Sequence, residues 1–354
     1  MTNALTHRRM IVFHGGQRSK VEGQREKNKQ MKQKVKCYID YKQFLCIPLA
    51  VLLSVLSVLS LKAAIPFQGS PPRVDTHIHL YDTRREGSVA FLHPERHEKV
   101  YFPHLAAQFT ETASPAGVDF AVVVEASSRR EDNYWLLQHV DTTDVLLAFI
   151  ANLDPRDPWY ESDLDSLLQI SDKFRGIRIR PGRPFRLDDP QLVENLLALE
   201  TRGLVLELGV NNVDPEDLIR IARLYPRMPI IINHLAGGNM RMDENGREEW
   251  KRRMAAFASE PNVYCKVSAL FDLSGQNPAP LDPDFYAPLI DPVIDAFGSE
   301  RVMFGSNWTL SDLFGTYKDM ICMLETYISG REDITEKQLF LVNTLRAYGV
   351  AIPY

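Results

Sequence analysis

Residues 203–234 read GLVLELGVNNVDPEDLIRIARLYPRMPIIINH, and the class of the fold can be inferred from them. Two short runs rich in Val, Ile and Leu flank a segment whose apolar residues recur every three to four positions. That pattern is typical of an amphipathic helix between two buried strands. Asp214 followed by Pro215 supplies a helix N-cap and a proline in the first turn. The stretch therefore predicts two parallel strands joined by a right-handed helical crossover.

The same alternation extends outward from this unit over most of the chain. Short apolar runs occupy residues 73–79, 118–126, 145–152, 174–180, 203–210, 229–234, 262–268 and 301–307. Segments with a helical pattern lie between them, at residues 133–140, 190–202, 215–225 and 291–298. Eight such units predict an α/β fold, a (β/α)8 TIM barrel. A doubly wound open sheet is the alternative, although no GxGxxG motif follows the first strand.

The composition is that of a globular protein with a large core. Of the 354 residues, 45% are hydrophobic and 25% are charged, which excludes a disordered, collagen-like or coiled-coil chain. The net charge of −5 is unevenly spread, because residues 1–42 hold 11 Lys and Arg against 3 Asp and Glu. The remainder carries a net charge of −13, so no nucleic-acid partner is expected.

The head of the chain has the pattern of an export signal. The stretch FLCIPLAVLLSVLSVLSL at residues 44–61 is uncharged, and its length fits either a signal peptide or a membrane anchor. The basic flank that precedes it predicts a barrel that is exported, or anchored outside the cytoplasm. Either Met1 or Met31 fits as the start of translation. The predicted divisions are a basic region (1–43), a signal peptide or membrane anchor (44–64), a linker (65–72) and the barrel (73–354).

Histidines end two of the predicted strands, where the chemistry of such barrels is located. His77 and His79 stand two residues apart, so on a strand both imidazoles point to the same side and can share one divalent metal. His234 ends the sixth strand after the apolar run PIII, and we expect it at the same rim. Structural histidines held by hydrogen bonds are the alternative.

Charged residues mark further strand ends. Glu125 ends VVVE and Glu207 lies inside VLEL, and burial of such a carboxyl raises its pKa, which suits a general base. Glu125 fits the rim better, with a salt bridge to a rim arginine as the alternative. Lys266 is predicted to polarise a carbonyl or to pair with Glu125. Arg178 and Arg180 share a side of their strand and predict a fork for a substrate carboxylate.

Seven motifs make the chain resemble the amidohydrolase superfamily. They are VDTHIHLYD (74–82), VVVEASSRREDNYWLL (122–137), FRGIRIRP (174–181), INHLAG (232–237), YCKVSAL (264–270), FGSNW (304–308) and NTLRAYG (343–349). They are most similar to the amidohydrolase-related branch of barrel hydrolases, which includes sugar lactonases, pyrone-dicarboxylate lactonase and metal-dependent decarboxylases. The resemblance implies a barrel over residues 73–350, without specifying a substrate.

The resemblance also implies roles for single residues. His77 and His79 match the metal-binding pair of the first strand, and His234 matches the histidine after strand six. Asn307 stands where the superfamily usually has an aspartate, in FGSDW, that activates the attacking water. Asparagine cannot accept that proton. The lysine and histidine that bridge two metals in other members have no match, which implies one weakly held divalent metal (Zn or Mn) or a metal-free site.

Residues and resemblance together predict a hydrolase that acts on a lactone or a related carboxylic ester. Glu125, Lys266 and Asn307 are the predicted catalytic residues, and the expected partner is a small organic or sugar acid or its lactone. A sugar-acid-binding barrel that has lost its base and a metal-dependent decarboxylase are the alternatives. A membrane contact is expected only through residues 44–61, and the oligomeric state is not predicted.

Overall fold

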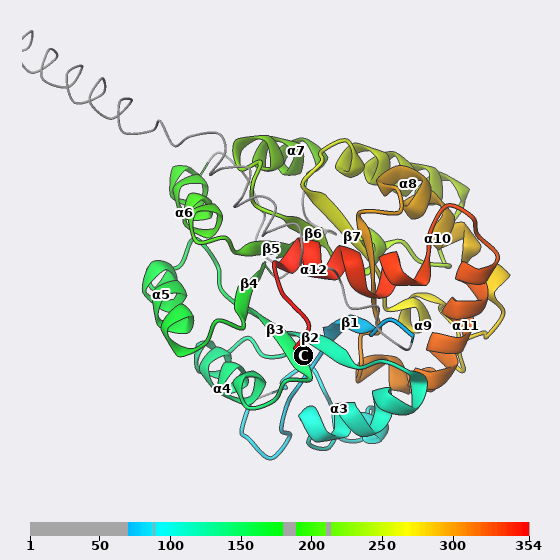
Figure 1. The fold of residues 1–354 in the computed structure, drawn as a ribbon, viewed down its shortest axis with the longest axis horizontal. Coiled ribbons are helices and arrows are strands. Elements are labelled where there is room, and N and C mark those ends of the chain that lie inside the picture. Colours follow the sequence, from blue (N-terminus) through cyan, green and yellow to red (C-terminus); the bar gives the residue numbers. More distant parts are fainter. Residues whose placement is uncertain (1–69, 88, 180–188, 210–213, 354) are drawn as a thin grey trace, which may run out of the picture. The chain divides into compact units, whose positions relative to one another are not determined.

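Eight parallel strands form a nearly closed barrel in a computed structural model that describes residues 70–87, 89–179, 189–209 and 214–353 (Figure 1). The strands are β1 (Val74–Ile78), β2 (Phe120–Val124), β3 (Leu146–Ala151), β4 (Phe174–Ile179), β5 (Val205–Leu208), β6 (Ile230–Ile232), β7 (Val263–Ser268) and β8 (Val302–Gly305). Their order around the sheet is the order of the chain. The predicted TIM barrel is therefore confirmed, and the doubly wound sheet is excluded.

Helices alternate with the strands along the chain. They are α3 (Ala106–Ala113), α4 (Arg130–Asp141), α5 (Tyr160–Ile170), α6 (Pro190–Thr201), α7 (Pro215–Leu224), α8 (Glu244–Ala258), α9 (Leu270–Leu273), α10 (Pro283–Phe297), α11 (Tyr317–Ser329) and α12 (Asn343–Tyr348). Short helical turns occupy Glu98–Val100, Ser114–Ala116, His234–Gly237, Leu310–Leu313 and Gln338–Val342. The predicted Asp-Pro start of α7 is present, because the Asp214 carboxylate accepts a hydrogen bond from the Glu216 backbone at 2.8 Å.

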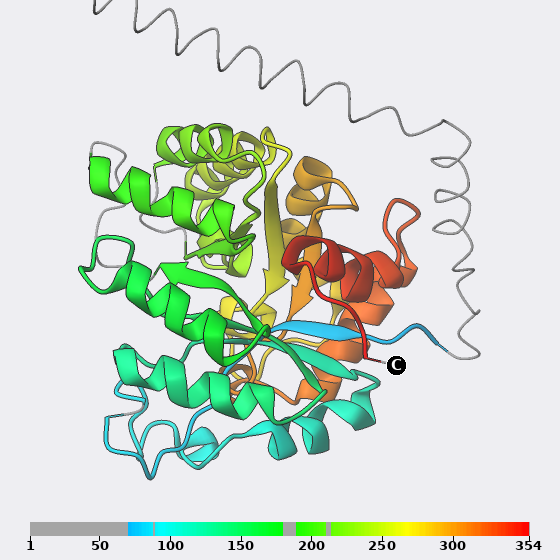
Figure 2. The same ribbon diagram turned by 60° about the vertical axis from the view of Figure 1, so that its left-hand side comes forward.

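Two apolar layers hold the barrel together. One lies between the strands and the surrounding helices, where neighbours such as α4, α5 and α6 pack side by side (Figure 2). The other fills the barrel interior, with Val74, Ile150, Ile231 and Met303 among its members. Alternate residues of each strand therefore face the helices and the interior.

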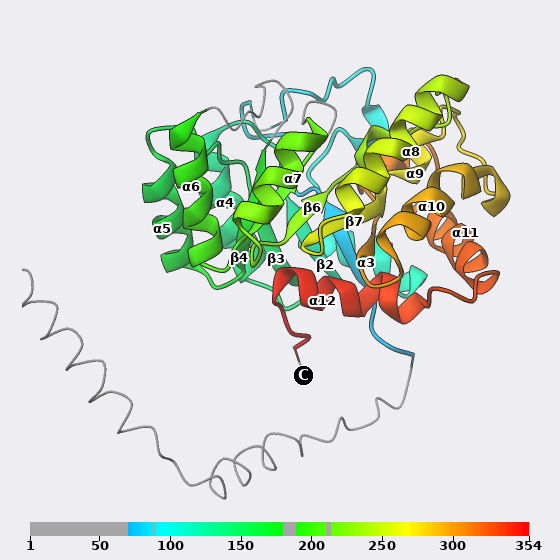
Figure 3. The same cartoon turned by 90° about the horizontal axis from the view of Figure 1, so that it is seen from above.

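The two ends of the barrel differ. Helix α12 lies across the end where the strands begin, and its Tyr348 is buried in the interior layer (Figure 3). The opposite end is formed by the segments that follow the strands, which in this architecture carry the chemistry. The end that holds the site is thus fixed by the direction of the strands.

Side chains and irregular backbone close the seam between the first and last strands. The backbone N–H of Asn307 donates to the His77 carbonyl at 2.9 Å, and that of His79 donates to the Trp308 carbonyl at 2.7 Å. Thr76 Oγ1 also donates to the Phe304 carbonyl. The segment after β8 is therefore held directly against the end of β1.

The predicted targeting segment at residues 44–61 lies outside the described residues, as do the rest of the head and Arg180. Within the described ranges, no helix has the length and apolar character needed to cross a membrane. Export or anchoring of the barrel stays a prediction.

Candidate active site

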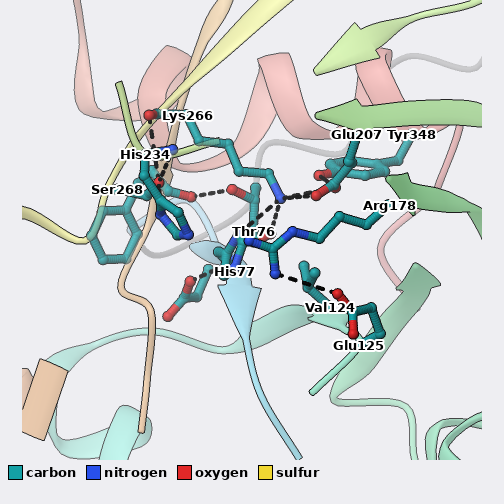
Figure 4. Close-up of polar contacts among 12 residues, drawn as sticks. Thr76, His77, Val124, Glu125, Arg178, Glu207, His234, Lys266, Ser268 and Tyr348 are labelled. Atoms are coloured by element: carbon teal, nitrogen blue, oxygen red, sulfur yellow. Dashed lines mark hydrogen bonds and ion pairs between the residues drawn. The ribbon is translucent and has the colours of Figure 1, made fainter. Parts of the chain in front are cut away.

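Three histidines meet at the mouth of the barrel, as the sequence predicted. His77 belongs to β1, His79 follows that strand, and His234 begins the turn after β6. The ring centroid of His77 lies 5.0 Å from that of His79 and 4.3 Å from that of His234. His234 adopts a left-handed backbone with φ of 51°, and its ring lies against that of His77 (Figure 4).

Backbone and hydroxyl groups fix the rings of His79 and His234. His79 Nδ1 lies 3.0 Å from the Val124 carbonyl, which can only accept, so Nδ1 carries the hydrogen. Ser268 Oγ lies 2.9 Å from His234 Nδ1 and accepts a hydrogen bond from the His234 backbone N–H at 3.0 Å. His79 therefore carries its lone pair on Nε2, and the hydroxyl of Ser268 holds the ring of His234 in place.

Lys266 is the centre of a fully buried ionic network inside the barrel. Its Nζ donates to both carboxylate oxygens of Glu207, at 2.8 and 2.9 Å, and to the Thr76 carbonyl at 2.8 Å. Tyr348 OH donates to the same Glu207 carboxylate at 2.6 Å. Burial lowers the pKa of Lys266 to about 8, although the Glu207 carboxylate opposes that shift. The predicted pairing of Lys266 with Glu125 is wrong, because Glu207 points into the interior beside it.

The same lysine sets the protonation of His77. Lys266 Nζ lies 3.3 Å from His77 Nδ1, and an ammonium group can only donate, so Nδ1 must accept. Burial, together with the Lys266 charge, holds the pKa of His77 well below its usual range. The neutral ring therefore carries its hydrogen on Nε2. That Nε2 is buried and has no hydrogen-bond partner in the described part of the chain, which leaves a donor available for a ligand.

These residues do not make a three-histidine metal centre. Metal binding needs a free lone pair on each imidazole, and tetrahedral sites need four ligands or three plus water. His77 instead offers an N–H, because its Nδ1 faces the Lys266 ammonium group. Among the described residues, no group of three His, Cys, Asp or Glu side chains is placed to hold a metal ion. The predicted metal role of His77 is not supported by this donor set, and we derive no step through a metal.

A second ion pair lies at the rim. Arg178 from β4 extends toward His77, and one of its terminal nitrogens lies 3.5 Å from Glu125 Oε1 at the end of β2 (Figure 4). The Glu125 side chain is fully buried, whereas 15% of the Arg178 side chain is exposed. Arg178 Nε is buried without a partner in the described residues. The pairing corresponds to the alternative considered for Glu125, and the fork with Arg180 stays untested.

Asn307 follows β8 and contacts a carboxylate that the sequence did not single out. Its backbone has a φ of 67°, and its side-chain Nδ2 donates to Asp272 Oδ1 at 3.0 Å. Burial raises the pKa of Asp272 to about 7, despite the hydrogen bond from Asn307. One pattern in the sequence could have pointed to Asp272: it is an acidic residue within the apolar run ALFDL, directly after the seventh strand.

A further buried carboxylate behind His77 also escaped the sequence analysis. Asp75 Oδ1 accepts from the backbone of His77 at 3.0 Å and of Ser306 at 2.9 Å, and Tyr317 OH donates to its other oxygen. A Cβ added at Gly305 would lie 2.7 Å from the His77 Cβ, so β8 can lie this close to β1 only because residue 305 is a glycine. Asp75 and Gly305 together hold His77 in place.

Comparisons with known proteins agree with this geometry. The family model described as Amidohydrolase (Amidohydro_2) matches residues 74–348. An L-fucono-1,5-lactonase of Burkholderia ambifaria is 30% identical over 252 residues, which cover 70% of this chain and 83% of that protein.

Two solved structures share the fold. A zinc-bound amidohydrolase from Burkholderia multivorans has a TM-score of 0.69 and 19% identity, covering 79% of this chain and all of that one. A probable 2-pyrone-4,6-dicarboxylic acid hydrolase from Acinetobacter baumannii has a TM-score of 0.62 and 16% identity, over 79% of this chain and 100% of that one. From the family match and the barrel geometry together, the chain belongs to the amidohydrolase family.

Proposed function

We propose that this enzyme hydrolyses the lactone of a sugar acid. The observation that carries the proposal is that His77 presents an N–H with no partner among the described residues, beside His234, whose neutral ring we take as the proton acceptor. Hydrolysis of an ester needs both, a donor for the carbonyl oxygen and an acceptor for the proton of water. The 30% identity to an L-fucono-1,5-lactonase supports the same substrate class.

The chain's own residues supply the steps. The carbonyl oxygen of the lactone accepts a hydrogen bond from His77 Nε2, which strengthens as negative charge develops there. Water adds to the carbonyl carbon while one of its protons passes to His234 Nε2. The ring C–O bond then breaks, and the departing alkoxide takes that proton to give the open hydroxy acid. Burial, together with the charges of Arg178 and Lys266, lowers the pKa of His234, so the ring is neutral and able to accept at pH 7.

Arg178 supports a substrate with several oxygen atoms. Its unpartnered Nε and its partly exposed head face the same mouth as the histidines. A guanidinium beside an ester carbonyl suits ring hydroxyls or a carboxylate of a sugar acid.

The direct test is turnover of the purified full-length chain on a panel of five- and six-membered sugar-acid lactones. We expect the rate of formation of the open acid to saturate with lactone concentration. The rate is measured from the proton that each new acid group releases. Binding of sugar acids without any turnover would overturn the proposal in favour of the impaired binding protein. Release of carbon dioxide from aromatic or sugar acids would overturn it in favour of a decarboxylase.

We also propose that the barrel works outside the cytoplasm. The support is the uncharged stretch 44–61 with a strongly basic segment before it. A reporter fused after Ser70 is expected to be exported. A fusion that stays in the cytoplasm would contradict the proposal, whatever the outcome of the lactone panel.

A further inference from the structure

The side chain of Asn307 is held in one orientation. Its Nδ2 donates to Asp272 Oδ1 at 3.0 Å, and the amide is planar, so its carbonyl oxygen Oδ1 faces away from Asp272. In the described part of the chain no residue donates to that Oδ1. The backbone N–H of Asn307 is bonded to the His77 carbonyl at 2.9 Å, which places Asn307 directly after β8 and next to the end of β1. Asn307 thus offers an acceptor oxygen at the same end of the barrel as His77.

Asp272 is built to hold this amide. It lies on α9 directly after β7, and Ala269 before that helix has a left-handed φ of 58°, which turns the chain sharply at the strand end. The Asp272 Oδ2 atom is buried and has no partner among the described residues, so Asn307 is the side chain that stabilises the carboxylate. A buried carboxylate with one side-chain donor is rarely kept for stability.

We propose that Asp272 is a positioning residue of this hydrolase, which fixes Asn307 so that its Oδ1 accepts a hydrogen bond from the attacking water. The proposal rests on the proposed lactone hydrolysis. It explains how the site works with an asparagine at the position where the family usually has an aspartate: Asn307 orients the water, and the proton passes to a histidine.

The pairing depends on the charge of Asp272. Burial raises the pKa of this carboxyl to about 7, and Asp312 from the turn Leu310–Leu313 opposes its ionisation further. Burial also raises the pKa of Asp312, to about 6, and Lys99 is the cation that acts on it. Below about pH 7 a protonated Asp272 donates instead of accepting, and the amide of Asn307 turns over. Activity is therefore expected to fall as the pH decreases through about 7.

The test compares Asp272→Asn with the wild type and with Asp284→Asn, an exposed carboxylate on α10 that serves as the matched control. A lost hydrogen bond to a charged group predicts a kcat for Asp272→Asn about 10- to 100-fold lower, with KM unchanged. The acidic limb of its kcat profile near pH 7 should disappear. Asp284→Asn should behave as wild type.

A double variant separates positioning from general damage. Adding Asp272→Asn to Asn307→Ala should lower kcat no further than Asn307→Ala does alone, because the amide to be positioned is already gone. Additive losses, or an acidic limb that survives in Asp272→Asn, would overturn the proposal.

A readout without catalysis keeps this inference distinct from the proposed function. The carboxyl carbon of Asp272, followed by NMR in ¹³C-labelled protein, should titrate near pH 7 and shift its midpoint upward in Asn307→Ala. An unchanged titration midpoint of Asp272 would overturn its pairing with Asn307. An absence of turnover on every lactone of the panel would overturn the proposed function alone.

Discussion

Two ion pairs of the barrel, one inside and one at the rim, differ in burial, distance and hydrogen bonding. Lys266 and Glu207 are both fully buried, lie 2.8 Å apart, and have further donors and acceptors from Tyr348 and Thr76. Arg178 and Glu125 lie 3.5 Å apart, and the arginine is partly exposed. A buried pair with all its hydrogen bonds made is fixed, whereas a long, partly hydrated pair can exchange partners with a ligand.

The comparison indicates that the shorter, buried pair acts on substrate only indirectly. Lys266 has its three hydrogens engaged by Glu207, Thr76 and His77, so none remains for a substrate. Its contribution is to define which nitrogen of His77 carries the proton. The rim pair, which is weaker in geometry, is the one placed to touch substrate.

The largest effect should come from breaking the inner pair. Lys266→Met leaves the Glu207 carboxylate buried without its cation, which costs about 3–5 kcal/mol of unfolding free energy. Urea denaturation followed by circular dichroism measures this loss. The double variant Lys266→Met with Glu207→Gln should regain part of the stability without regaining activity. A Lys266→Met variant as stable as the wild type would show that the pair has no structural role.

Removing the donor that the inner pair orients should come next. His77→Ala deletes the N–H assigned to the carbonyl oxygen, and loss of one such donor lowers kcat about 10²- to 10³-fold. Steady-state kinetics on the best lactone gives the value, and His93→Ala, in an exposed loop, is the control. A His77 variant with normal kcat would refute the assigned role.

The rim pair should give a smaller and different effect. If Glu125 only holds Arg178, then Glu125→Gln should raise KM about tenfold, which corresponds to about 1.4 kcal/mol, and leave kcat nearly unchanged. If Glu125 is instead the base that the sequence predicted, kcat should fall about 10²- to 10⁴-fold. The split between KM and kcat decides between them.

The smallest effect is expected from metal removal. Because His77 donates from Nε2, the three rings lack the lone pairs of a metal centre, and dialysis against a chelator should leave kcat within about twofold of the untreated enzyme. Elemental analysis before and after dialysis provides the control. Loss of activity that added Zn²⁺ or Mn²⁺ restores would show that His77 changes its protonation to bind metal.

The sequence predicted the barrel and its histidines because both follow from periodicity. Because His77 and His79 are two residues apart, they lie on the same side of their strand, whatever the position of that strand in the fold. Partners across the barrel do not follow from spacing. Lys266 and Glu207 meet because β5 and β7 both direct these residues inward at the same depth, which depends on the register of three strands. Asp272 was missed for the same reason, since its importance arises from Asn307 on another strand end.

The seam beside His77 also affects how the protein is made. Asp75 binds the backbone of Ser306 and the hydroxyl of Tyr317, partners that lie 231 and 242 residues further along the chain. Contacts of such sequence separation form late, because a long loop must close first. During synthesis His77 leaves the ribosome far ahead of the residues that hold it, so a chain that ends before β8 lacks the groups that fix this histidine. Closure of the barrel therefore also completes the surroundings of His77.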